Sequence, residues 1–323
     1  PLFLVIASSH LAARAAARLG KIDIAPETPL LTIDQALAAN SRFEDGPRIY
    51  AKGDADTALG AAVHRLTGKL EIGGQEHFYL EGQAALALPG EAGDMLIQSS
   101  TQHPTEIQHK VAEAIGLPMH AVRVETRRMG GGFGGKESQG NALAVACAIA
   151  ARATGRPCKM RYDRDDDYAR CGWAMDLSLP VADRAMLHAD NAYHLTDVRI
   201  TSHRLRTNTQ SATAFRGFGG PQGIVGIERV MDHIASHLGL DPLEVRRVNF
   251  YADSEAPAPA VADPAPPLPH ADADLASRGA QAQLSESTPV DVPTSGQQTT
   301  PYQQPVTDCI INALVDRLSD SAD

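Results

Sequence analysis

The chain has 323 residues, of which 43% are hydrophobic and 21% are charged, so it can bury the cores of two or three modest domains. Its 29 basic and 39 acidic residues give a formal net charge of −10, which argues against a nucleic-acid binder because phosphate backbones are held by clustered cations. No apolar run approaches the roughly 20 residues of a membrane span. The four cysteines show no CxxC spacing, so any iron–sulfur cluster is expected on another chain or segment. We expect a cytoplasmic protein that binds neither membranes nor nucleic acid.

Residues 1–60 are predicted to be the remainder of a leading α/β module. Residues 2–6 have the composition of a buried strand, and a serine can cap an alanine-rich helix over residues 8–19. A threonine cap precedes a short helical stretch over residues 32–40, and Gly, Asp and Pro then indicate a surface connection over residues 41–56. Because the sequence begins inside a strand-like run without an initiator Met, we expect that the gene product starts earlier.

Residues 61–251 are predicted to form a larger domain around a mixed sheet. The predicted strands lie at residues 70–72, 78–80, 84–88 and 122–125, and the predicted helices at residues 104–115, 141–153 and 222–238. Asp241, Pro242 and Glu244 supply the N-cap, the N1 proline and the capping-box acid of one more helix. The fold class predicted from these elements is α+β, with mixed sheets and packed helices.

The last part of the chain is predicted to be a linker followed by a helix. Residues 252–306 hold ten of the 21 prolines and one aromatic residue, a composition that cannot bury enough surface to order itself. Residues 307–323 are predicted to begin a further segment, with Thr307 as the cap of an amphipathic helix.

The segment that ends at Glu137 is the first candidate site. It reads GGGFGGKE over residues 130–137, which places five glycines in seven positions between a predicted strand and a predicted helix. Such a loop lets the backbone approach a ligand closely, and the N–H groups at the following helix terminus favour an anion. The alternative is a tight turn whose glycines only relieve crowding.

This loop matches two phosphate-binding patterns only in part. Gly130, Gly132 and Gly135 satisfy GxGxxG, but no suitable acidic residue ends a second strand roughly 20 positions on. Residues 130–136 also fit GxxxxGK, but Glu137 stands where a Ser or Thr would bind magnesium, and its carboxylate would repel phosphates. Dinucleotide and ATP binding are therefore disfavoured.

A second glycine-rich segment reads AFRGFGGPQG over residues 214–223, just before a predicted helix. Its lone cation is Arg216, and a guanidinium held at a cleft can stabilise a developing negative charge. The alternative is a surface arginine paired with a nearby carboxylate. His233 and His237 lie at i, i+4 on the next helix without a third ligand, so we expect no residue that binds a metal directly.

Four segments in this order support a specific resemblance. They resemble the molybdenum-binding subunit of xanthine dehydrogenases, in the molybdenum hydroxylase (aldehyde oxidase) family; the segments are GGQEHFYLE at 73–81, SSTQHP at 99–104, GGGFGGKE at 130–137 and AFRGFGGPQG at 214–223. The likeness covers about residues 1–251, and the stretch from Gln298 onward resembles the next family segment. It implies a molybdopterin-binding domain of the molybdenum hydroxylase type.

The resemblance also implies roles for individual residues. In this family a molybdopterin dithiolene holds a molybdenum with oxo, sulfido and hydroxo ligands, and the hydroxo oxygen enters an electron-poor C–H carbon. Gln102 resembles the glutamine that hydrogen-bonds the oxo ligand. Gly132, Phe133 and Gly134 resemble the loop that brings backbone amides to the cofactor, and Arg216 is expected to contact it as well.

Glu137 resembles the carboxylate that binds and activates a purine, and Arg216 resembles the arginine on the opposite side, which offsets negative charge on the heterocycle. The implied reaction is the oxidation of xanthine and hypoxanthine to urate with oxygen from water. FAD and [2Fe-2S] clusters are expected on a partner subunit, and hence a hetero-oligomer. The alternatives are an aldehyde or other N-heterocycle oxidoreductase, or a non-catalytic fragment or pseudosubunit.

The sequence departs from the family pattern in two places. Asp167 runs straight into Tyr168 where relatives have a few tens of further residues, so we expect an internal strand pair to be missing at 167/168. No GQG motif for the cofactor pyrophosphate follows Arg216, and no GEPP motif carries the glutamate that deprotonates the Mo–OH group. Losing a general base costs about 10²–10⁴-fold in rate, so the chain alone is expected to be inactive and to hold cofactor poorly.

Overall fold

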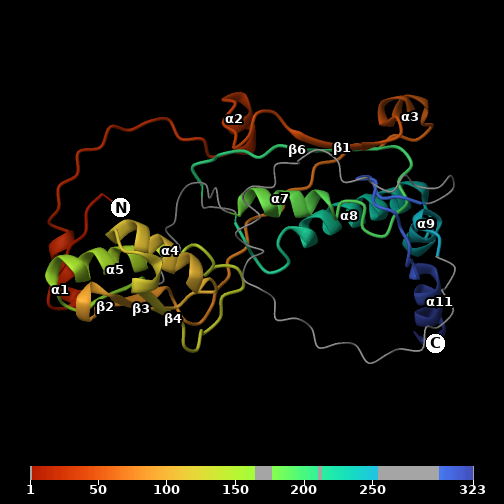
Figure 1. The fold of residues 1–323 in the computed structure, drawn as a ribbon. Coiled ribbons are helices and arrows are strands. Elements are labelled where there is room, and N and C mark those ends of the chain that lie inside the picture. Colours follow the sequence, from red (N-terminus) through yellow and green to blue (C-terminus); the bar gives the residue numbers. More distant parts are fainter. Residues whose placement is uncertain (1, 164–176, 210–212, 254–297, 323) are drawn as a thin grey trace, which may run out of the picture. The chain divides into compact units, whose positions relative to one another are not determined.

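The computed structural model describes residues 2–163, 177–209, 213–253 and 298–322 (Figure 1). The chain divides into two units that alternate along the sequence. Unit 1 comprises residues 1–49, 68–189 and 201–226, and unit 2 comprises residues 50–67, 190–200 and 227–323. The described parts combine helices with mixed and two-stranded sheets, which confirms the α+β fold class. The predicted deletion at 167/168 lies outside the described residues.

A four-stranded mixed sheet forms the core of unit 1. Its strands are β2 (Ala84–Pro89), β3 (Met95–Ser99), β4 (Val122–Glu125) and β5 (Cys158–Arg161), in the order β4-β3-β2-β5. β2 is antiparallel to β3 and to β5, whereas β3 is parallel to β4. The short 3-10 helices η1 (Glu91–Gly93) and η2 (Met119–Ala121) precede β3 and β4.

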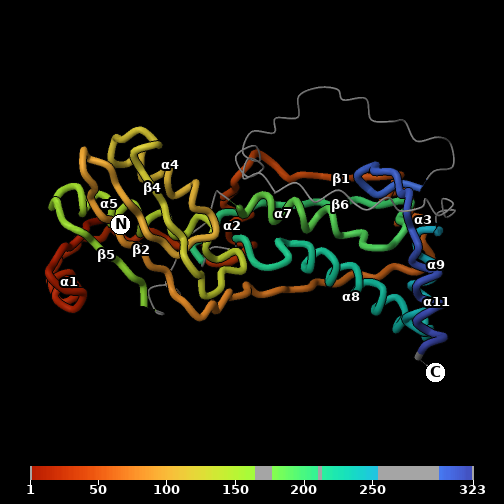
Figure 2. Tube along the Cα trace, turned by 60° about the horizontal axis from the view of Figure 1, so that its bottom comes forward, coloured from red at the N-terminus to blue at the C-terminus, as the bar shows by residue number. Residues whose placement is uncertain are grey.

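Two helices, α4 (Pro104–Ile115) and α5 (Asn141–Thr154), pack on this sheet (Figure 2). Their buried side chains form one hydrophobic cluster with the inward face of the strands; it includes Ala85, Ala87, Ile97, Ile107, Val111, Leu143, Ala144 and Ala148. Gly116 and Gly155 end the two helices in the left-handed conformation, which confirms the predicted helix ends. The loops that connect these strands and helices therefore begin and end at residues of this packed core.

The remaining helices of unit 1 include α1 (His10–Ala17), α2 (Ile33–Ala38) and α7 (Ser178–Met186). Ser9 and Thr32 cap α1 and α2, as predicted, and Thr32 forms a full capping box with Gln35. The predicted strand over residues 2–6 is wrong: no strand forms there, and Leu2 is 81% exposed. A segment of strand-like composition forms a strand only when it pairs with a neighbouring strand. None of the described strands pairs with residues 2–6.

Two more predicted strands, at residues 70–72 and 78–80, are also wrong, since no strand occurs between residues 62 and 83. A strand over 48–52 was not predicted: β1 (Arg48–Lys52) pairs with β6 (Val198–Ser202) in a two-stranded sheet. β1 lies within residues 41–56, whose Gly, Asp and Pro content is typical of a surface connection.

Helices α3 (Ala55–Ala61), α9 (Pro242–Asn249) and α11 (Ile311–Ala322) belong to unit 2, and α8 (Gly220–Leu238) begins in unit 1. The core of unit 2 contains the buried residues Tyr193, Met231, Ala235 and Val245. Asp241 caps α9, as predicted. Among the described helices, none is both long and apolar enough to cross a lipid bilayer.

The C-terminal helix begins later than predicted, and its cap is a different residue. Asp253 accepts hydrogen bonds from the backbone N–H groups of Asn312 and Ala313, each at 2.9 Å, so Thr307 is not the cap. Within the predicted linker 252–306, residues 298–306 form a turn closed by the Thr299–Pro305 bridge. The part of that linker from 254 to 297 lies outside the described residues.

Candidate functional site

The first glycine-rich segment, called loop 1 here (residues 126–140), connects β4 to α5 in unit 1. Phe133 and Gly134 both have positive φ angles, 52° and 96°, and the Gly135 N–H donates to the Gly132 carbonyl at 2.8 Å. Two successive residues with positive φ between these bonded ends form a tight turn of the type I′ kind. The turn leaves the Phe133 side chain 46% exposed.

Loop 1 holds the side chain of Gln102, which lies between β3 and α4. The Gln102 Oε1 atom accepts hydrogen bonds from the Gly134 N–H at 2.9 Å and the Lys136 N–H at 3.3 Å. The Gln102 N–H in turn donates to the Lys136 carbonyl at 2.7 Å. A Cβ at Gly132 would overlap Gln102 Oε1, so this approach requires glycine. Two amides of loop 1, those of Gly134 and Lys136, thus fix Gln102.

The second glycine-rich segment, called loop 2 here (residues 213–220), repeats the same backbone turn. Phe218 and Gly219 have φ angles of 52° and 93°, and the Gly220 N–H donates to the Gly217 carbonyl at 3.1 Å. Gly219 also lies so close to the Val181 carbonyl of α7 that no Cβ would fit. A close approach and a positive φ both require glycine at this position.

The two loops meet inside unit 1. A Cβ at Gly134 would lie 2.7 Å from the Ala214 carbonyl oxygen, so the two backbones are in contact there. Glu137 follows Gly134 by three residues and is half-buried, and Arg216 follows Ala214 by two residues and is exposed. No hydrogen bond or ion pair joins Arg216 to another described residue. The predicted acid and guanidinium therefore lie on adjoining loops.

A buried lysine within loop 1, which sequence reasoning missed, ties the loop to Glu81 and Ser100. Lys136 is 0% exposed, and its Nζ atom lies 3.0 Å from Glu81 Oε2, donates to Ser100 Oγ at 2.7 Å and lies 4.6 Å from the centre of the Tyr79 ring. Partial burial opposes ionisation of Glu81, but the hydrogen bonds from Ser100, Gly130 and Lys136 lower the pKa of this carboxyl.

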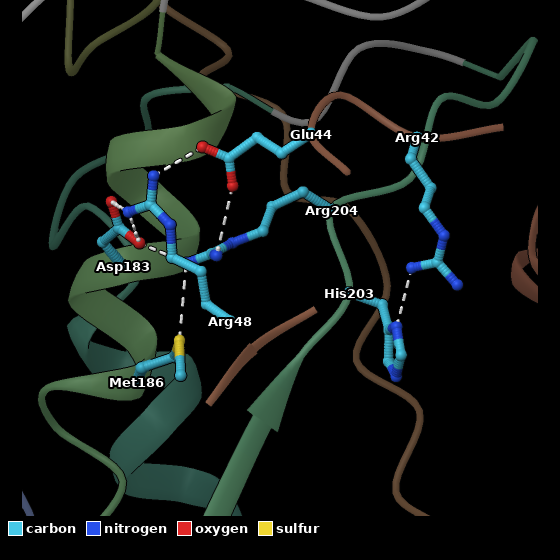
Figure 3. Close-up of polar contacts among 7 residues, drawn as sticks. All are labelled: Arg42, Glu44, Arg48, Asp183, Met186, His203 and Arg204. Atoms are coloured by element: carbon cyan, nitrogen blue, oxygen red, sulfur yellow. Dashed lines mark hydrogen bonds and ion pairs between the residues drawn. The ribbon is translucent and has the colours of Figure 1, made fainter. Parts of the chain in front are cut away.

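A second polar network fixes the helix that supports loop 2 (Figure 3). Arg204, whose side chain is 3% exposed, forms ion pairs with Asp183 of α7 and, at 3.4 Å, with Glu44. Arg48 donates to both carboxylate oxygens of Asp183, at 2.8 and 2.7 Å, and also pairs with Glu44. Two cations and two acids alternate in this network, so α7 is held at the position where it contacts Gly219.

Comparison with known proteins identifies the domain. The molybdopterin cofactor-binding domain family matches residues 42–170 and 166–250. The chain belongs to this family. The chain is 40% identical over 279 residues to xanthine dehydrogenase of Drosophila pseudoobscura pseudoobscura, covering 76% of the chain and 21% of that protein. It is 39% identical over 283 residues to xanthine dehydrogenase/oxidase of Gallus gallus, covering 78% of the chain and 21% of that protein.

The fold of this molybdopterin cofactor-binding domain also occurs in solved structures. Quinoline 2-oxidoreductase from Pseudomonas putida 86 matches with a TM-score of 0.70 at 20% identity, over 98% of the chain and 41% of that protein. Aldehyde oxidoreductase from Desulfovibrio gigas matches with a TM-score of 0.65 at 25% identity, over 77% of the chain and 32% of that protein. The chain is therefore a member of the molybdenum hydroxylase family, and it spans about a fifth of the length of the curated relatives.

The molybdopterin cofactor-binding domain has a donor that fits the cofactor. Because Gln102 Oε1 accepts from two backbone amides, the amide orientation is fixed and the Nε2 group is turned the other way. Gln102 is exposed, and its Nε2 atom has no hydrogen-bond partner among the described residues. An exposed NH₂ donor beside a glycine-rich turn suits an oxygen ligand of a metal, so the residues present fit the cofactor.

Proposed function

We propose that this chain forms part of a molybdenum hydroxylase that oxidises xanthine and hypoxanthine to urate, with the inserted oxygen derived from water. The electrons would pass to [2Fe-2S] clusters and FAD on a partner subunit. The curated relatives named xanthine dehydrogenase, at 39–40% identity, support this choice of substrate. Because the chain spans about a fifth of their length, the activity would belong to the complete enzyme.

The observation that carries the proposal is the anchoring of Gln102 by the backbone of loop 1. Two amides hold Oε1 at 2.9 and 3.3 Å, which leaves Nε2 as a preorganised donor for an oxygen ligand of the metal. When bound, the cofactor supplies the oxygen atom and takes up the two electrons of the oxidation. Gln102 would hold the cofactor in one orientation, since its own rotation would break two hydrogen bonds.

Glu137 and Arg216 are proposed to bind the two edges of the flat heterocycle. A carboxyl group can exchange hydrogen bonds with a ring nitrogen on one edge, and a guanidinium on the other edge offsets negative charge that develops during attack. Both residues lie on loops whose backbones touch at Gly134 and Ala214. An aldehyde offers neither edge, so this pair favours a purine.

The test uses the native enzyme that carries this sequence. Glu137→Gln is expected to lower kcat/KM for xanthine by about 10²–10³-fold and to change aldehyde turnover much less, because only the purine uses the carboxyl group. Glu113→Gln on the exposed side of α4 is the matched control. Undiminished purine turnover in Glu137→Gln would favour an aldehyde or another heterocycle as the substrate.

Arg216→Met is expected to lower xanthine turnover by a similar factor, because charge on the ring would lose its counter-ion. Arg156→Met, at an exposed position after α5, is the control. Molybdenum content per chain, measured by metal analysis, separates loss of cofactor from loss of chemistry. A substrate-binding role predicts that both Glu137→Gln and Arg216→Met retain molybdenum.

A further inference from the structure

Residues 75–81 run along both glycine-rich loops in unit 1, and the side chains of His77, Tyr79 and Glu81 contact these loops. Gln75 accepts from Gln222 at the start of α8, Tyr79 is buried, and Glu81 binds the Gly130 N–H of loop 1. The intervening Phe78 and Leu80 are 70% and 92% exposed. Inward and outward side chains alternate from His77 to Glu81, but the segment is not a regular extended strand, because Phe78 has a positive φ of 46° and no strand partner is present among the described residues. His77 lies between Gln75 and Tyr79 in this series.

His77 contacts loop 2 through a hydrogen bond and a ring contact. Its Nε2 atom lies 2.5 Å from the Ala214 carbonyl oxygen, so Nε2 carries the proton and donates. Its ring lies 5.2 Å from the Phe215 ring, measured between centroids. Ala214 is 1% exposed, and a buried carbonyl without a donor would be costly.

The other side of the same imidazole lies against loop 1. A Cβ at Gly135 would be 2.7 Å from His77 Cγ, so the ring rests on the Gly135 backbone. Gly135 directly precedes Lys136, whose N–H and carbonyl groups both bond to Gln102. His77 is therefore wedged between the loop that carries Glu137 and the loop that carries Arg216.

We propose that His77 is a positioning residue that sets the separation of loop 1 and loop 2, and through it the fit of a flat substrate between Glu137 and Arg216. This inference rests on the proposed function for its substrate, but the coupling of the two loops does not depend on it. A shift of one loop by a fraction of an ångström would move Glu137 or Arg216 away from its edge of the substrate. The same shift would leave the packing of the sheet almost unchanged.

The first measurement tests the coupling alone, by amide hydrogen exchange in the 323-residue chain. His77→Phe keeps a ring beside Phe215 but removes the donor, and it is expected to speed exchange in residues 213–220 about fivefold, the effect of one net hydrogen bond. His77→Gln, which retains an N–H donor, should restore exchange to within about twofold of the original protein. Exchange in β2 and β3 should be unchanged in both variants, which reports that they fold.

The second measurement tests the fit of the substrate, in the native enzyme loaded with cofactor. His77→Phe is expected to raise KM for xanthine about tenfold at unchanged molybdenum content, and His77→Gln should recover most of it. His109→Phe, on the exposed side of α4, is the control and should change neither readout. A purely structural role would lower the active fraction and leave KM as it was.

Unchanged exchange in residues 213–220 of His77→Phe would overturn the coupling. Faster exchange together with an unchanged KM for xanthine would overturn the role in substrate fit. If the original enzyme oxidises no purine at all, the proposed function fails, while the exchange measurement still decides whether His77 couples the loops.

Discussion

Removing the partner of the buried lysine tests how loop 1 is supported. In Glu81→Gln the Lys136 ammonium keeps a neutral acceptor but loses its counter-charge at 3.0 Å. The gross Coulomb attraction at that distance is about 5 kcal/mol for an effective dielectric of ~20. Leaving a buried charge unpaired costs about 3–5 kcal/mol, and the 42% exposure of the Glu81 side chain reduces this, so we expect a loss of about 2–3 kcal/mol.

Lys136→Met should cost less, about 1 kcal/mol, although it removes the same ion pair. Methionine fills the space of the lysine stem, and Glu81 keeps its hydrogen bonds from Ser100 at 2.6 Å and from the Gly130 N–H at 3.0 Å. The unequal costs follow because Lys136 is fully buried and Glu81 can still reach water.

The assay is urea unfolding of the 323-residue chain. The transition is monitored through hydrogen exchange of the β2 and β3 amides, which belong to unit 1. The double variant is expected to cost less than the sum of the two single variants, because both remove one interaction. A larger loss in Lys136→Met than in Glu81→Gln, or strict additivity, would refute the reasoning.

The same pair predicts a pH dependence. Since the pKa of Glu81 is lowered in the folded protein, the stabilisation is fully present above the ordinary glutamate value of about 4.3 and is lost as the pH falls through the folded value. The stability difference between the original protein and Glu81→Gln should therefore shrink below about pH 4. A difference that stays constant on acidification would contradict the assignment.

Three further outcomes are expected. Gly219→Ala, at φ +93° against the Val181 carbonyl, should cost about 3 kcal/mol or more in urea unfolding, whereas Gly226→Ala, with open space around it in α8, should gain up to about 1 kcal/mol. Burial raises the pKa of the Cys147 thiol to about 12, so iodoacetamide at pH 8.5 should leave Cys147 unmodified in peptide mass spectra of the folded chain. The composition of residues 254–297 predicts a linker, so replacing them by an eight-residue Gly-Ser loop should preserve the cooperative transition and stabilise unit 2 by about 1–2 kcal/mol, and a loss of that transition would refute the prediction.

The long helices could be predicted because their signals are local. Residues 104–115, 141–153 and 222–238 carry complete apolar stripes with glycine or proline at their ends, and the structure has helices within two residues of these bounds. The strand errors have the opposite origin. Residues 2–6 and 78–80 have strand-like composition, but a strand depends on a partner far away in the sequence, and the structure provides none among the described residues.

The candidate site was predictable to the same extent. The glycine-rich composition of loops 1 and 2 is a local signal, so both loops could be found from the sequence, whereas the distant neighbours that make glycine necessary at Gly134 and Gly219 appear only in the structure. The residues that hold the loops in place could not be predicted. Lysine is expected at the surface, and Lys136 pairs with Glu81, which precedes it by 55 positions. His77 and Glu81 contact the loops while Phe78 and Leu80 are exposed, which is the reverse of the usual burial of apolar side chains.

Loop 1 holds Gln102 through backbone N–H groups, and a substitution changes the side chain of a residue while its peptide group stays the same. Any residue other than proline that tolerates the turn presents the same N–H at position 136, so the anchoring of Gln102, and with it the proposed donor to the metal, does not depend on the identity of that side chain. Glu137 and Arg216 differ in this respect, because their proposed roles depend on their side chains, which a substitution replaces. Under the proposed function, substitutions at Glu137 and Arg216 would change which compound is oxidised and would leave the backbone contacts that hold Gln102 in place.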